Sequence, residues 1–170
     1  MLDVACGSGR HVRHLADRGL RVTAVDRNRE ALARSDGIAE LIEADLEGST
    51  WPFPGRRFDA VVVTNYLWRP LLPTLVASVA EGGWLLYETF ALGQQQFGRP
   101  SNPEFLLRPG ELLACVPGLH VVAYEDGVLE HPPRRMQRLA AWRPTSSDAL
   151  PPFLAVTSQA LEFPPPQDTP

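Results

Sequence analysis

The chain has 170 residues, of which 44% are hydrophobic, and carries a net charge of −4 at pH 7. This is enough for one domain with a hydrophobic core, and because there is neither a run of 18 apolar residues nor a basic leader, we expect a soluble cytoplasmic protein without a membrane partner. The 16 basic residues are all arginine and are dispersed, which argues against a nucleic-acid partner. Cys6 and Cys115 lie far apart in no metal-type spacing, which argues against a disulfide or a zinc site.

The beginning of the chain is apolar except for Asp3, and Gly7 and Gly9 follow it. A helical pattern then starts at once, with apolar residues at Val12, Leu15 and Ala16. Glycines between a strand and a helix let the backbone turn tightly and approach a ligand, while the free N–H groups of the helix start point at that ligand. The pattern predicts a nucleotide-like cofactor at a strand–loop–helix corner. It is not the dinucleotide fingerprint, because Val12 takes the place of the third glycine.

A second and a third strand are predicted at residues 20–25 and 38–44, with a short helix at 29–34 between them. Asp26 ends the second strand, where an α/β sheet places an acceptor for ribose hydroxyls. The alternative is that Asp26 only caps the helix that follows. Asp45 comes directly after the third strand and is a second candidate for ligand binding. The alternative is that Asp45 is a loop acid that faces water.

Residues 58–66 are apolar on both faces, which is typical of a central parallel strand covered by helices. A helical stripe follows at 71–79, and we expect residues 81–83 (Glu-Gly-Gly) to end that helix before a fifth strand at 84–90. Glu88 near the end of this strand could orient a substrate amine, accept a proton or pair with an arginine.

Residues 91–105 form a polar connection rich in Gly, Pro and Gln that we expect to be structureless. It is either a substrate-selecting lid, with Arg99 and Asn102 as candidate contacts, or a surface insertion. After a short helix from residue 109, strands at 119–124 and 136–142 are close enough to pair as an antiparallel hairpin. The turn between them is expected to hold the acids Glu125, Asp126 and Glu130, together with His131, which is either a base over the site or a solvated turn residue.

The segment Asp3-Val-Ala-Cys-Gly-Ser-Gly9, with the acids that follow it, resembles motif I of class I S-adenosylmethionine-dependent methyltransferases. The likeness runs from Leu2 to about Arg143 and is nearest to small bacterial members, with a distant similarity to the tellurite-resistance and ubiquinone-biosynthesis types. It implies an α/β fold with a Rossmann-like, doubly wound, mostly parallel seven-stranded sheet closed by an antiparallel C-terminal hairpin. It also implies S-adenosylmethionine as cofactor and S-adenosylhomocysteine as product.

The resemblance also implies site residues. Gly7 and Gly9 would cradle the methionine part of the cofactor, and Asp3 would hold its ammonium group through water. Asp26 would bind the ribose and Asp45 the adenine edge. The full cofactor-binding set is Asp3, Gly7, Ser8, Gly9, Asp26, Arg27, Asp45, Leu46 and Asn65, and the catalytic candidates are Tyr66 and Glu88, with Trp68 as a further candidate for the reaction rim.

We expect residues 1–143 to form the methyltransferase domain and the Pro-rich residues 144–170 to be an extended or disordered tail. Family members usually carry a cover helix before the first strand, and here the chain starts inside that strand. The predicted function is methyl transfer to a small-molecule acceptor. The alternatives are a non-catalytic cofactor-binding module and a nicotinamide-dependent reductase; the acceptor atom and the oligomeric state are not predicted.

Overall fold

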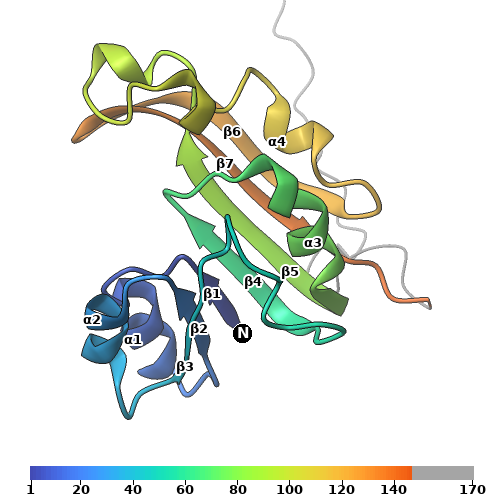
Figure 1. Cartoon of the computed structure of the whole chain (residues 1–170). Coiled ribbons are helices and arrows are strands. Elements are labelled where there is room, and N and C mark those ends of the chain that lie inside the picture. Colours follow the sequence, from blue (N-terminus) through green and yellow to red (C-terminus); the bar gives the residue numbers. More distant parts are fainter. Residues whose placement is uncertain (147–170) are drawn as a thin grey trace, which may run out of the picture.

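The computed structural model describes residues 1–146, and its centre is a seven-stranded sheet in the order β3-β2-β1-β4-β5-β7-β6 (Figure 1). The strands are β1 (Leu2–Val4), β2 (Thr23–Asp26), β3 (Glu40–Glu43), β4 (Phe58–Thr64), β5 (Val79–Phe90), β6 (His120–Glu130) and β7 (Pro133–Trp142). The pairs among β1 to β5 are parallel, while β7 runs antiparallel to both β5 and β6. The predicted fold, including the closing hairpin, is confirmed.

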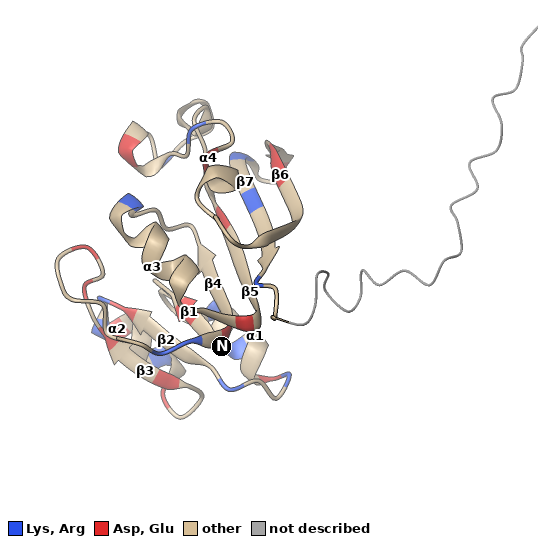
Figure 2. Cartoon of the chain, turned by 90° about the vertical axis from the view of Figure 1, so that its right-hand side faces the viewer, with Lys and Arg blue, Asp and Glu red and all other residues tan. Residues whose placement is uncertain are grey.

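Helices lie on both sides of the sheet. They are α1 (Arg10–Ala16), α2 (Arg29–Leu32), α3 (Leu72–Ala77) and α4 (Glu111–Ala114), with short 3₁₀ turns η1 (Ala33–Ser35), η2 (Arg69–Leu71), η3 (Gln94–Gln96) and η4 (Pro103–Phe105). Figure 2 shows α3 and α4 on one side of the strands and α1 on the other. Alternate residues of a strand point to opposite faces, so each face of the sheet needs its own cover.

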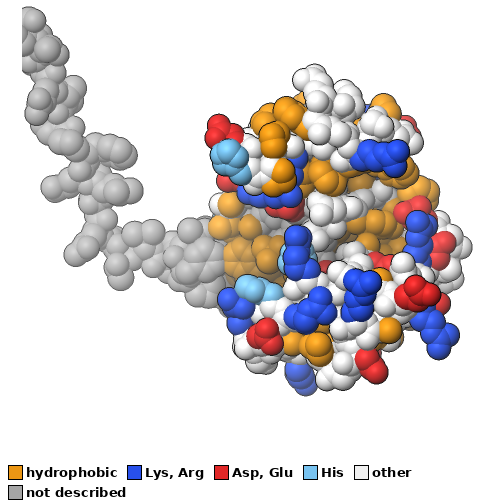
Figure 3. Space-filling model, turned by 90° about the vertical axis from the view of Figure 1, so that its left-hand side faces the viewer, with side chains coloured by type: hydrophobic (Ala, Val, Ile, Leu, Met, Phe, Trp, Pro, Cys, Tyr) orange, Lys and Arg blue, Asp and Glu red, His pale blue; other side chains and the backbone are white. Residues whose placement is uncertain are grey.

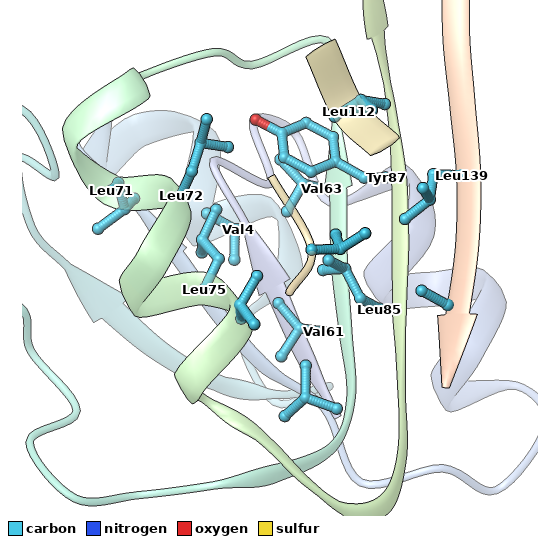
Figure 4. Close-up of a cluster of buried hydrophobic side chains, with 14 of the residues drawn as sticks. Val4, Val61, Val63, Leu71, Leu72, Leu75, Leu85, Tyr87, Leu112 and Leu139 are labelled. Atoms are coloured by element: carbon cyan, nitrogen blue, oxygen red, sulfur yellow. The ribbon is translucent and has the colours of Figure 1, made fainter. Parts of the chain in front are cut away.

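Two hydrophobic clusters result from this arrangement. The smaller cluster packs α1 and α2 on β2 through Val12, Ala24 and Leu32. The larger one packs α3 and α4 on β1, β4, β5 and β7, and Figure 4 shows its centre; its members include Val4, Val61, Val63, Leu72, Leu75, Leu85, Tyr87, Leu112 and Leu139. The apolar pattern of residues 58–64 is therefore that of a central strand, as the sequence predicts.

One face of the sheet around β5 is open. Leu85 is 1% exposed under α3 and α4, whereas its neighbour Leu86, on the opposite face, is 39% exposed. Among the helices that the structure describes, α1 lies on this side but packs with β2 rather than with β5. A leucine in the middle of a central strand is therefore partly accessible to solvent.

The prediction that residues 81–83 end a helix is wrong, because α3 ends at Ala77 and β5 already begins at Val79. The guanidinium of Arg143 donates hydrogen bonds to the carbonyl oxygens of Val76 (2.6 Å) and Val79 (2.9 Å), and so satisfies the helix end. Gly83 lies inside the strand, where a Cβ would be 2.8 Å from a backbone oxygen. The Arg143 contacts join distant parts of the chain, whereas the oxygen nearest to a Cβ on Gly83 belongs to Ala80, three residues earlier.

The connection at residues 91–105 is more ordered than predicted. It contains η3 and η4, and Gln94 is 3% exposed. The Gln94 side chain donates to the Arg99 carbonyl and accepts a hydrogen bond from the Arg135 backbone N–H at 2.8 Å, which fastens the connection to β7. Polar composition predicts a loop but does not reveal such an anchor.

The hairpin is longer than predicted. Strand β6 extends to Glu130, so that Glu125, Asp126 and Glu130 lie in a strand and not in a turn, while His131 is in the turn as expected. Cross-strand ion pairs favour the extension, since Asp126 pairs with Arg135 and Glu125 pairs with Arg138.

The described residues contain no helix that is long and apolar enough to cross a membrane. The domain boundary at residue 143 stays a prediction. Most of the predicted tail, residues 147–170, lies outside the described residues.

Leu85 and Leu86 provide a matched test of the open face. We expect Leu85→Ala to lower the free energy of unfolding by about 2–5 kcal/mol, because it leaves a cavity in the larger cluster. Leu86→Ala should cost about 1 kcal/mol or less, since its side chain is partly solvated already. Urea unfolding of both variants measures the difference, and equal losses would contradict an open face.

Candidate functional site

The carboxyl ends of the parallel strands meet at one edge of the sheet, where ligands bind in open α/β folds. Figure 3 looks onto this edge and shows a hollow between an upper and a lower part of the molecule, with hydrophobic side chains inside it. The chain turns sharply here: φ is +51° at Ala5, +54° at Gly7, +74° at Gly9 and +55° at Asn65. Two of these are not glycine, and such backbone conformations are concentrated at functional sites.

The glycine-rich loop is held close to its neighbours. A Cβ on Gly9 would lie 1.9 Å from the Ser35 hydroxyl oxygen, so only glycine fits between α1 and η1. Nothing lies within 4 Å of a Cβ built on Gly7, which leaves that part of the loop open to a ligand. The exposed Ser8 accepts a hydrogen bond from Arg13 at its carbonyl oxygen.

Asp26 joins the loop to β2. One of its carboxylate oxygens accepts the Gly7 backbone N–H at 2.8 Å, and the other accepts the Asn28 backbone N–H at 2.8 Å. The next helix has its own cap, because the Asn28 side chain accepts from the Ala31 N–H. Each carboxylate oxygen has two lone pairs, so Asp26 can still accept hydrogen bonds from a ligand.

A cavity of about 200 Å³ brings five of the predicted residues together. Its lining includes Asp26 and Arg27 from the end of β2, Asp45 and Leu46 after β3, and Tyr66 after β4. The Asp45 carboxylate accepts the Glu47 backbone N–H at 3.0 Å, which orients it in a turn. The exposed Arg27 lies at the rim, and the half-buried Leu46 supplies apolar surface.

Tyr66 shares this cavity with the acids. Its hydroxyl oxygen is buried and has no hydrogen-bond partner among the described residues. Burial, reinforced by Glu47 and Asp45, raises the pKa of Tyr66 well above its usual range. Tyr66 therefore keeps its proton at neutral pH and can donate a hydrogen bond to a ligand.

Asp3 is a buried carboxyl group beneath the loop. Its side chain is fully buried, and neither of its oxygens has a hydrogen-bond partner among the described residues. Burial raises the pKa of Asp3 to about 7, against an opposing effect of Arg10. A buried acid without a partner is costly, and a cationic ligand group would relieve that cost.

Asn65 ends β4 between Thr64 and Tyr66. Its backbone N–H donates to the Glu88 carbonyl at 2.9 Å, and the Tyr87 hydroxyl donates to the Tyr66 carbonyl at 2.9 Å. The two bonds fix the exit of β4 to the end of β5.

Glu88 forms an ion pair with Arg138, with 2.5 Å between Oε2 and Nε, and Arg138 also approaches Glu125 at 3.4 Å. Of the three possibilities that the sequence left open for Glu88, pairing with an arginine is the one observed.

The remaining candidates lie elsewhere. Trp68 packs against the larger hydrophobic cluster, and Asn102 caps η4 by accepting the Glu104 N–H at 3.1 Å. Arg99 and His131 are exposed. None of the four lines the 200 Å³ cavity.

Sequence reasoning missed His11. Its ring nitrogen Nδ1 lies 3.4 Å from the Thr64 hydroxyl oxygen, at the carboxyl edge of the sheet. The sequence did contain a signal: His11 is in the first turn of the helix that follows Gly9, and the start of that helix points at the ligand edge.

Residues 1–82 match the family described as methyltransferase domain. The match covers slightly less than half of the chain and supports the predicted resemblance to class I methyltransferases. No curated protein matches the chain significantly.

Solved structures of other proteins share the fold of this chain. TehB from Haemophilus influenzae is 18% identical with a TM-score of 0.65, and the match covers 84% of this chain and 57% of TehB. The N-methyltransferase NodS from Bradyrhizobium japonicum is 16% identical with a TM-score of 0.64, covering 85% of each chain. The present chain thus spans little more than half the length of TehB.

A third similar structure, magnesium protoporphyrin IX methyltransferase from Synechocystis, contains bound S-adenosylhomocysteine. It is 15% identical with a TM-score of 0.64, covering 84% of this chain and 73% of that one. The family match and this structure agree with the cofactor that the sequence predicts. The unpaired Asp3 carboxyl and Tyr66 hydroxyl fit a cofactor that carries both an ammonium group and hydrogen-bond acceptors.

Asp3 predicts an unusual dependence of stability on pH. The unfolded chain loses the Asp3 proton near pH 4, whereas the folded protein keeps it up to about pH 7. The ligand-free free energy of unfolding should therefore fall as pH rises across this window, by at most about 1.4 kcal/mol per pH unit from this residue. Asp3→Asn should remove this component, while Asp17→Asn, at an exposed acid, should retain it. Urea unfolding at pH 5 and pH 7 measures both, and parallel pH dependences in Asp3→Asn and wild type would contradict the assignment.

Proposed function

We propose that the protein transfers a methyl group from S-adenosylmethionine to a small-molecule acceptor by in-line displacement. The observation that carries the proposal is the 200 Å³ cavity, where Asp26 and Asp45 from the ends of two neighbouring strands face one space beside the glycine-rich loop. Carboxylates at strand ends accept hydrogen bonds from sugar hydroxyls and from amino groups, which are the donors of an adenosine.

We assign the cofactor contacts as follows. The methionine part would lie against the backbone of Gly7, Ser8 and Gly9, and Asp3 would neutralise the ammonium group of the methionine part. Asp26 with Arg27 would bind the ribose, and Asp45 with Leu46 would bind the adenine. Tyr66 lines the same cavity, so we propose it as a hydrogen-bond donor to the cofactor rather than as a residue of the acceptor rim.

The bound cofactor supplies an electrophilic methyl group on a sulfonium. The protein's task is alignment, with the nucleophile held about 3 Å from the methyl carbon, and such positioning can supply about 7–11 kcal/mol. Asn65 would line the sulfonium with its backbone, which its hydrogen bond to β5 holds in place. Glu88 would act through its ion pair with Arg138 by shaping the acceptor side of the site.

The first experiment is thermal unfolding with and without S-adenosylhomocysteine. Ligand at 100 times its dissociation constant should add about 2.7 kcal/mol of stability, a rise of several degrees in Tm. Absence of a shift would contradict the cofactor assignment. A shift without turnover would identify a non-catalytic binding module, and a fluorescence change with NADH would favour a reductase.

Two substitutions locate the cofactor. Asp26→Asn and Asp45→Ala should each weaken S-adenosylhomocysteine binding by about 10- to 100-fold, because each removes a charged hydrogen-bond acceptor worth about 1.5–3 kcal/mol. Asp36→Ala is the matched control, since Asp36 is an exposed acid outside the cavity. Titration calorimetry measures all three, and wild-type affinity in Asp45→Ala would refute the adenine assignment.

A further inference from the structure

A second cavity, of about 320 Å³, lies on the open face of the sheet between β4, β5, β7 and β6. Its apolar wall includes Val62, Leu86, Ala123 and Ala140, and its polar end holds Glu88 and Arg138. The exposed side chain of Leu86 belongs to this wall. An apolar cleft with a few convergent polar groups is the usual form of a small-molecule site, and its volume is within the range of such sites.

The linings of the two cavities are neighbours in sequence at the end of β4. Thr64 lines the second cavity and Tyr66, two residues later, lines the first. The same short segment of chain would thus contact a ligand in either cavity.

His11 stands where the second cavity approaches the glycine-rich loop. Its Nδ1 is 3.4 Å from the Thr64 hydroxyl, and its Nε2 is 3.4 Å from the Arg10 guanidinium. Of the two ring nitrogens, Nδ1 therefore faces Thr64 and the second cavity, while Nε2 faces Arg10. The Arg10 contact is long and exposed, so it does not fix which nitrogen carries the ring proton.

The charges around His11 keep its ring neutral. Burial lowers the pKa of His11, and Arg10 and His14 on the same helix lower it further, while Glu88 on β5 opposes them. Glu88 is itself paired with Arg138 of β7. At neutral pH the ring is therefore neutral, and with its own proton on Nε2 it can accept a proton at Nδ1.

We propose that the second cavity receives the methyl acceptor and that His11 takes the proton which the acceptor gives up. The acceptor is then a small molecule with an apolar body and a hydroxyl or amine nucleophile. This proposal rests on the methyl-transfer function proposed above. The acceptor oxygen or nitrogen forms the new bond to the methyl carbon, the carbon–sulfur bond breaks with its electron pair left on sulfur, and the acceptor proton passes to Nδ1 of His11, the ring nitrogen on the Thr64 side.

Tyramine is a suitable probe, because it carries both a phenol and an ammonium group on one apolar ring. We would measure transfer of a trideuterated methyl group from S-adenosylmethionine to tyramine by mass spectrometry. His11→Gln should lower kcat at least 100-fold, as expected for loss of a general base, with an unchanged thermal shift by S-adenosylhomocysteine. His14→Gln, one turn further along α1, is the matched control and should keep the wild-type rate.

The position of the acceptor is tested separately. Ala123→Trp fills the second cavity and should raise the KM for tyramine at least tenfold. Val128→Trp adds the same side chain at an exposed position of the same strand outside this cavity, and should leave KM unchanged.

In addition, kcat should rise with pH to a plateau, and Glu88→Gln should move that rise to lower pH, because the carboxylate raises the pKa of His11.

Several results would overturn the proposal. They are a wild-type kcat in His11→Gln, an unchanged KM in Ala123→Trp, or no labelled tyramine from a wild-type protein that still shows the S-adenosylhomocysteine shift. If that shift is absent as well, the proposed function fails, so the two failures are distinguishable.

Discussion

The site depends on one carboxylate that bridges two strands. Asp26 closes β2 and accepts the Gly7 N–H with one oxygen and the Asn28 N–H with the other. These bonds hold the glycine-rich loop over the end of β2 and start the next helix in a fixed direction. Charge-assisted hydrogen bonds of this kind are among the strongest that a protein makes. The position of the first cavity follows from this bridge, since Asp26 is also part of its wall.

Local pattern was sufficient to predict the sheet and the cofactor edge. Asp3, Gly7 and Gly9 have the spacing of a strand–loop–helix corner, and Asp26 and Asp45 each follow a strand, so topology alone brings them to one edge. The closing hairpin was predictable because two strands so close in sequence leave no room for a crossover. Which atoms the acids bind was not predictable, because hydrogen-bond partners are set by tertiary structure.

The errors arose where distant side chains decide local structure. Arg143 satisfies the end of α3, and Gln94 fastens the 91–105 connection to β7, yet both act over more than 40 residues of sequence. His11 was missed for the same reason, since its importance depends on Thr64 and Glu88, which come from two other strands. The periodicity of apolar residues shows which face of a helix or strand is buried, but it does not identify the element that packs against that face.

The order of the strands has a consequence for association between molecules. Strands β3 and β6 are the edges of the sheet, and unpaired edge strands invite pairing with the edge of another copy. Both edges are acidic: β3 begins and ends with Glu40 and Glu43, and β6 carries Glu125, Asp126 and Glu130. Several of these acids are paired with arginines, as Glu40 is with Arg56 and Asp126 with Arg135, so each edge presents charged groups of both signs. Charged side chains on an edge strand disfavour its pairing with the edge of another copy.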